Sequence, residues 1–127
     1  MIAVDTSALM AIVLADAEAD ACMAILETEP AIVISAGTVA EVLIVAARRN
    51  VAYEMAKLID GLGFDVVTVT AASARRIAAA YERWGKGVHP AGLNFGDCFA
   101  YEVARAHDCR LLFVGNDFSK TDLESVL

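Results

Sequence analysis

Short apolar runs alternate with longer segments of helical periodicity along the whole chain, and this alternation limits the possible folds most strongly. Each run is too short for a helix and lacks the polar–apolar alternation of a half-exposed strand, which predicts strands buried on both faces. The predicted strands cover residues 2–4, 31–34, 64–69 and 110–114. Helical segments between successive strands predict a parallel sheet covered on both sides, so the expected fold class is α/β.

Length and composition indicate one domain spanning residues 1–127. The chain is 58% hydrophobic, which is enough for a substantial core. Its longest unbroken apolar run, residues 8–15, is far shorter than the roughly 20 residues that span a bilayer. The N-terminal apolar stretch has no basic residue before it and meets Asp5 at once, unlike a secretory signal. We therefore expect no membrane association.

The three cysteines are odd in number and widely separated. Cys22, Cys98 and Cys109 form no CxxC pair and have no metal-finger spacing. This usage predicts free thiols in a reducing compartment, and hence a cytoplasmic location.

Charge is distributed unevenly along the chain. Residues 1–47 contain seven acids and no lysine or arginine, whereas the remaining residues hold equal numbers of acids and bases, so the net charge of −7 belongs to the first third. Such a surface repels nucleic acid. Any nucleic-acid function must therefore depend on a metal ion, a local basic patch or a second subunit.

Acid and amide side chains stand where a parallel sheet would bring them to one edge. Asp5 follows the first predicted strand, and Asn116 and Asp117 follow the last. Ligands of such sheets bind beyond the carboxyl ends of the strands. Glu41 and Asp97 each enter a helical segment that is otherwise largely apolar, where an unpaired buried carboxylate is costly.

Each of these acids also has a purely structural interpretation. Asp5 and Asp97 stand near predicted helix starts, where aspartate commonly caps backbone N–H groups. Thr38 and Glu41 have the spacing of a capping box. Taken singly, each acid is therefore open to both interpretations.

Convergence of the four positions would narrow the chemistry. Several close carboxylates stay ionised only beside a cation, and oxygen ligands favour Mg²⁺ or Mn²⁺ over zinc. Such an ion can activate water against a phosphodiester bond. The sequence contains no HExxH zinc motif, no GxGxxG and no glycine-rich phosphate loop with a lysine.

Four blocks, residues 1–8, 35–41, 89–101 and 111–122, resemble in order the PIN-domain toxins (VapC) of VapBC toxin–antitoxin systems. The resemblance covers nearly the whole chain. It implies an α/β/α sandwich with a central parallel sheet of four to five strands, and an endoribonuclease dependent on Mg²⁺, with Mn²⁺ as the other candidate ion. It also implies an RNA substrate, a homodimer, and a VapB antitoxin that blocks the site within a hetero-oligomer.

The acidic positions of the family correspond to Asp5, Glu41 and Asp97. The fourth position, aligned on Phe118, falls on Asn116 and leaves Asp117 one residue further on. The resemblance therefore implies that all five side chains are catalytic and that Asp5, Glu41, Asp97 and Asp117 hold the metal. We expect both Asn116 and Asp117 to line the site, with Asp117 the favoured acid.

Binding surfaces are less clearly marked. The loop at residues 85–94 and the flanking Arg83 carry cations beside Trp84, a combination that can hold single-stranded RNA. Trp84 also has helical spacing with Ile77 and Tyr81, which is typical of core packing. The acidic residues 1–47 are a candidate landing surface for a basic antitoxin segment.

The competing hypothesis is a non-catalytic acidic α/β module that binds a partner, either a degenerate PIN domain or a receiver-like domain. A receiver would need a phosphorylatable aspartate after its middle strand and a lysine directly after the last. Here Asp65 lies inside the third predicted strand, and the first lysine after the last strand is Lys120. Because all three core acids are present, the sequence favours the ribonuclease.

Overall fold

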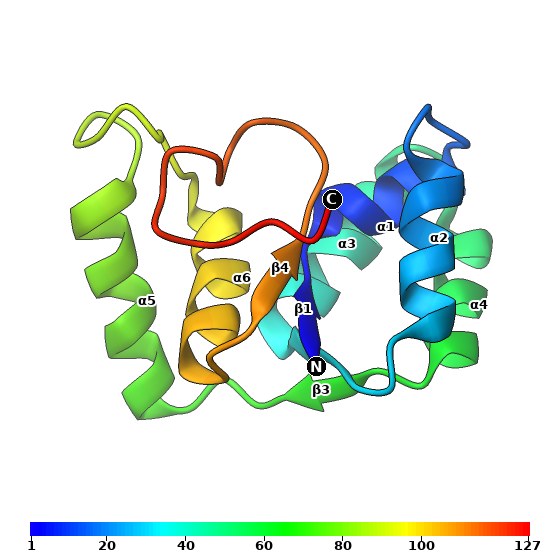
Figure 1. Ribbon diagram of the computed structural model, residues 1–127, viewed down its shortest axis with the longest axis horizontal. Helices are drawn as coiled ribbons and strands as arrows, with labels where there is room; N and C mark the ends of the chain where they lie inside the picture. The colour runs from blue at the N-terminus through cyan, green and yellow to red at the C-terminus, as the bar shows by residue number, and fades with distance from the viewer.

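The computed structural model describes residues 1–127 as a four-stranded parallel sheet between two layers of helices. The elements are β1 (Ile2–Val4), α1 (Thr6–Val13), α2 (Ala19–Thr28), β2 (Ile32–Ser35), α3 (Ala36–Arg48), α4 (Ala52–Leu62), β3 (Asp65–Val67), α5 (Ala71–Trp84), α6 (Phe95–Ala106) and β4 (Arg110–Leu112). Helices α5 and α6 cover one face of the sheet and α1 to α4 the other (Figure 1). The predicted α/β/α sandwich is confirmed.

The strand order, β3-β2-β1-β4, places β1 at the centre of the sheet. Ala3 is in register with Val33 of β2 on one side and with Leu111 of β4 on the other. The chain moves outward from β1 through β2 to β3 and then crosses to the opposite side of β1. This reversal lies at the carboxyl ends of β1 and β4, the position at which parallel α/β sheets bind ligands.

Alternate side chains of the strands enter two separate cores. Ala3, Val33 and Leu111 pack with α5 and α6. Ile2, Val4 and their neighbours on the opposite face pack with α1 to α4. Burial on both faces explains why the central strands are continuous apolar runs.

The four predicted strands are all present, and β2 and β4 differ from their predicted bounds by one or two residues. The third strand is shorter than predicted, and Asp65 and Val66 are exposed because β3 is the edge of the sheet. Helix α6 begins at Phe95 because the side chain of Asn94 accepts a hydrogen bond from the backbone N–H of Asp97 (2.8 Å) and so caps the helix.

Two sequence features can also be located. The cysteines are free; Cys22 and Cys98 are buried and Cys109 is half-buried. The longest helix, α5, has 14 residues, and none of the helices combines the length and apolarity needed to cross a bilayer.

A chain of hydrogen bonds ties α5, α6 and the C-terminal segment together. The buried Trp84 donates from Nε1 to the hydroxyl oxygen of Tyr101 (2.9 Å), and that hydroxyl donates to Oδ1 of Asp122 (2.7 Å). The core interpretation of Trp84 is therefore correct, and its ring is not exposed for stacking on RNA.

Replacing Tyr101 by Phe tests this chain. The Tyr101→Phe variant leaves the buried Trp84 N–H without its acceptor, and we expect it to lower the free energy of unfolding by about 1–3 kcal/mol. Urea denaturation followed by the fluorescence of Trp84, the sole tryptophan, measures the change. Tyr53→Phe, at a side chain that makes no hydrogen bond and is 71% exposed, is the matched control. Equal losses of stability in the two variants would show that the hydrogen bond from Trp84 to the Tyr101 hydroxyl does not stabilise the fold.

Candidate active site

Asp5 is the most deeply buried acid at this end of the sheet. It ends β1 and caps α1, and its Oδ2 accepts hydrogen bonds from the backbone N–H (3.0 Å) and the hydroxyl (2.6 Å) of Ser7. Its Oδ1 is buried and has no hydrogen-bond partner. Capping therefore accounts for one oxygen only, and the buried Oδ1 keeps its capacity to accept a hydrogen bond or to bind a cation.

Ser7 connects Asp5 to the end of β4. While its hydroxyl donates to Asp5, its Oγ accepts from the backbone N–H of Val114 (3.0 Å), just beyond β4. The segment that carries Asn116 and Asp117 is thereby tied to the first turn of α1. No local sequence pattern signals this link, because it joins Ser7 to a residue 107 positions away.

Asp97 caps its helix and lies close enough to Asp5 for the charge of Asp5 to raise its pKa. Its Oδ2 accepts from the backbone N–H of Asn94 (3.0 Å), completing a capping box at the start of α6. The side chain is buried. As with Asp5, the capping interpretation is correct for one oxygen and does not explain why the acid is buried beside other acids.

Glu41 does not belong to a capping box with Thr38. Helix α3 begins at Ala36, and its N-cap is Ser35, whose Oγ accepts from the backbone N–H of Gly37 (3.2 Å). Glu41 lies further along the helix, and its Oε1 accepts a hydrogen bond from the hydroxyl of Thr6 (2.5 Å). The capping-box interpretation is therefore wrong, and a residue adjacent to Asp5 holds the Glu41 carboxylate.

Gly96 makes room for that carboxylate. A Cβ atom at this position would overlap Oε2 of Glu41. Since Gly96 directly precedes Asp97, the missing side chain lets α3 and α6 bring Glu41 and Asp97 close together. A glycine in the first turn of a helix was the only sequence signal for this contact.

Asn116 and Asp117, the two candidates for the fourth acidic position, differ in charge and in their contacts. Asn116 and Asp117 are both exposed and follow β4 across Gly115, which has a φ of 100°. The charge of Asp117 raises the pKa of Asp97, which places Asp117 within electrostatic range of the site. Asn116 uses its backbone carbonyl to accept from Ser119, and its side chain makes no hydrogen bond in the structure.

The acids repel one another, and Asp5 and Asp97 are buried away from water. Burial raises the pKa of Asp5 from 3.8 to about 6; its bonds to Ser7 lower it, and the charge of Glu41 raises it further. Burial also raises the pKa of Asp97 to about 7; the Asn94 N–H opposes this, and the charges of Asp5, Asp117 and Glu41 add to it. The site therefore favours either protonation or a bound cation.

The side chains as placed form no group of three or more His, Cys, Asp or Glu that could hold a metal ion. Mg²⁺, however, is usually held by one or two carboxylates and completes its coordination with water. Asp5, with its unpartnered oxygen, and Asp97 fit that mode of binding. The charges of Glu41 and Asp117 act on Asp97, because both raise its pKa.

Comparison with known proteins identifies the family. The PIN domain family matches residues 2–124. Ribonuclease VapC36 of Mycobacterium tuberculosis is 44% identical over 125 residues, which cover 95% of this chain and 90% of that protein. Ribonuclease VapC42 of the same species is 38% identical over 124 residues, which cover 94% of this chain and 95% of that protein. The chain therefore belongs to the PIN-domain family and groups with its VapC members.

Solved structures agree on the fold. The M. tuberculosis toxin VapC20, described as cleaving the sarcin–ricin loop, superimposes with a TM-score of 0.78 at 21% identity, covering 98% of this chain and 97% of that one. A toxin–antitoxin complex from Klebsiella pneumoniae contains a chain with a TM-score of 0.73 at 20% identity, covering 100% and 97%.

The electrostatic cost of the site predicts how stability depends on pH. In EDTA, the pKa values of Asp5 and Asp97 are higher in the folded chain than in the unfolded chain, so the folded state binds more protons between about pH 4 and 7. Their contribution to stability is therefore lost as the pH rises through this window.

We expect Asp5→Asn to remove the share of this loss that belongs to Asp5. The amide oxygen can still accept from Ser7, so at pH 8 the variant should be more stable than the wild type by about 1–3 kcal/mol, and at pH 3 nearly equal to it. Urea denaturation across this pH range measures the difference. Asp65→Asn, the same change on the exposed edge strand, should show no such dependence, and a parallel response of the two variants would contradict the electrostatic assignment.

Proposed function

We propose that this protein is the toxin of a VapBC-type toxin–antitoxin pair, an endoribonuclease that depends on Mg²⁺ or Mn²⁺. The observation that carries the proposal is the orphaned, buried Oδ1 of Asp5 beside a second buried acid, Asp97. Relatives named as ribonucleases, at 36–44% identity over nearly the whole chain, support the same conclusion.

The chain's own groups would divide the work as follows. Asp5 and Asp97 would hold the cation, Glu41 and Asp117 would orient water beside it, and Asn116 would contact water or the substrate without adding charge. When bound, a divalent cation would activate a water molecule and stabilise the negative charge that develops on the phosphate. Thr6 holds the carboxylate of Glu41, and Ser7 holds that of Asp5. No histidine base is required, and products with 5′-phosphate and 3′-hydroxyl ends are expected.

An antitoxin has two suitable surfaces beside this site. An apolar pocket of about 330 Å³ adjoins Glu41, between α3 and α6, and Phe95 at its edge is 71% exposed. Asp16, Glu18 and Asp20 form an exposed acidic stretch at the start of α2. We propose that a VapB-type antitoxin covers the pocket with apolar side chains and meets the acids with basic ones. A homodimer and a cytoplasmic location belong to the same proposal.

A non-catalytic binding module remains the second candidate. The observation in its favour is that the carboxylates do not already form a group able to hold a metal ion. The two candidates differ in one outcome, because a binding module would take up Mn²⁺ or a partner without cutting RNA.

Cleavage of total tRNA and ribosomal RNA by the purified chain tests the proposal. We expect discrete cuts with Mg²⁺ and none in EDTA. Asp97→Asn, whose amide oxygen can still accept the hydrogen bond from the backbone N–H of Asn94, should lower the cleavage rate on the order of 10²–10³-fold. Asp65→Asn is the matched control and should cleave as the wild type does. Cleavage that survives both EDTA and Asp97→Asn would contradict the metal–carboxylate mechanism, and a folded wild type that cuts none of these RNAs would favour the binding module.

Thr6 offers a second test, because its hydroxyl holds Glu41. Thr6→Val keeps the shape of the side chain and removes the donor, so we expect Mn²⁺ affinity and cleavage to fall by about 10–100-fold. Thr6→Ser should restore most of both. Mn²⁺ binding is measured by calorimetry, independently of cleavage. A valine variant that binds Mn²⁺ as well as the wild type would show that this hydrogen bond is only structural.

A further inference from the structure

A groove between α5 and α6, on the outer side of these helices, gathers three arginines. It has a volume of about 320 Å³, and Arg76, Arg83 and Arg105 surround a lining of alanines, Tyr101 and Glu102. All three arginine side chains are more than half exposed, although they lie against buried residues. The chain has a net charge of −7, and three of its ten lysines and arginines lie at this one groove.

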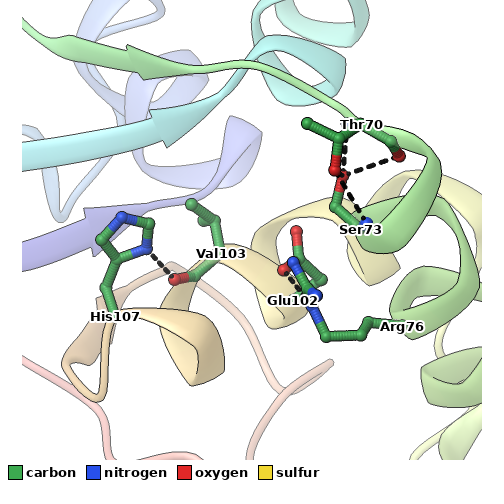
Figure 2. Close-up of polar contacts among 6 residues, drawn as sticks. All are labelled: Thr70, Ser73, Arg76, Glu102, Val103 and His107. Atoms are coloured by element: carbon green, nitrogen blue, oxygen red, sulfur yellow. Dashed lines mark hydrogen bonds and ion pairs between the residues drawn. The ribbon is translucent and has the colours of Figure 1, made fainter.

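Arg76 is the structural member of the group. Its Nε donates to Oε2 of Glu102 (3.1 Å), a buried acid on α6, and the pair joins the two helices (Figure 2). Removing Arg76 would leave Glu102 buried without a partner, which is strongly destabilising. Arg76 is therefore unsuitable for a binding test.

Arg83 and Arg105 are held in place but keep their donors free. Their guanidinium groups lie 3.7 and 4.0 Å from Oδ2 of Asp122, too far for hydrogen bonds, and neither side chain makes any hydrogen bond in the structure. The Arg83 guanidinium also lies over the ring of Trp84, 4.4 Å from its centroid. Two oriented guanidinium forks thus face the groove with unused N–H donors, the groups that bind phosphate best.

The groove is on the same helix as the proposed active site. Asp97, Tyr101 and Arg105 are spaced at i, i+4 and i+8 of α6, so they lie along one side of it. Eight residues of helix place Arg105 about 12 Å from Asp97 along the axis. A few nucleotides of an extended strand span that distance.

We propose that the α5–α6 groove binds the phosphodiester backbone of single-stranded RNA outside the cleavage site. The inference rests on the proposed function and extends it with a second contact on the same substrate. Three guanidinium groups against the two carboxylates of Glu102 and Asp122 leave a net charge of +1 at the groove, in a chain whose net charge is −7. Binding there would hold an RNA that the acidic surface otherwise repels.

Fluorescence anisotropy with a labelled oligouridylate, in EDTA so that no cleavage occurs, tests this groove. The double variant Arg83→Gln/Arg105→Gln should bind about tenfold more weakly and should lower the slope of log affinity against log salt by about 1.4, or 0.7 for each lost phosphate contact. Arg48→Gln/Arg49→Gln makes the same charge change at the exposed end of α3 and is the matched control, with an expected change below about twofold. Arg83→Lys/Arg105→Lys should keep most of the salt dependence.

Equal weakening by the two glutamine variants, an unchanged Arg83→Gln/Arg105→Gln variant, or a wild type that does not bind the oligonucleotide would each overturn the proposal. Thermal denaturation of each variant checks that it is folded. Cleavage is scored separately with Mg²⁺. Binding that depends on Arg83 and Arg105 in a chain that never cleaves would retain the groove and reject the ribonuclease. If the wild type cleaves RNA and the Arg83→Gln/Arg105→Gln variant binds the oligonucleotide as tightly as the wild type does, the ribonuclease is retained and the groove is rejected.

Discussion

The burial of Asp5 at the centre of the sheet is the constraint on which the rest of the site depends. The strand order places the carboxyl end of β1 beside those of β2 and β4, so an acid at this point lies away from water. Ser7 holds one of its oxygens and joins it to the end of β4. The hydroxyl of Thr6, the residue between Asp5 and Ser7, donates a hydrogen bond to Glu41 of α3. The first turn of α1 therefore sets the positions of carboxylates from two elements.

This arrangement lowers the free energy of unfolding when the acids are ionised, and the raised pKa values of two of them show it. Asp5 and Asp97 carry raised pKa values because they are buried and lie close to other acids. Burial of like charges does not help the fold, so such a site favours either protonation or the binding of a cation. One oxygen of each aspartate serves as a helix cap, which fixes the side chain and leaves the other oxygen outside the cap.

Much of this could be predicted from the sequence, because the informative signals are local. Continuous apolar runs indicated the central strands, and acids directly after the first and last of them indicated one edge of the sheet. The incorrect predictions concern competition between neighbours and contacts across the fold. Ser35 rather than Thr38 caps α3, which leaves Glu41 to Thr6, and Asn94 starts α6 before Asp97.

Other features had no local signature. The role of Gly96 depends on how α3 packs on α6, and the hydroxyl of Ser7 meets a backbone group 107 residues away. The arginines of the α5–α6 groove are far apart in the sequence and become one surface only when the helices pair. Trp84 had two interpretations, and its bond to Tyr101 decides for the core.

The central claim is that buried, mutually repelling carboxylates form a site for a divalent cation, and NMR titration of the aspartate side-chain carboxyl carbons tests it most directly. In EDTA, the account predicts that the carboxyls of Asp5 and Asp97 titrate near pH 6 and 7, and that Mg²⁺ shifts both titrations to lower pH. Aspartates that all titrate near their ordinary pKa of 3.8 and do not respond to Mg²⁺ would contradict it.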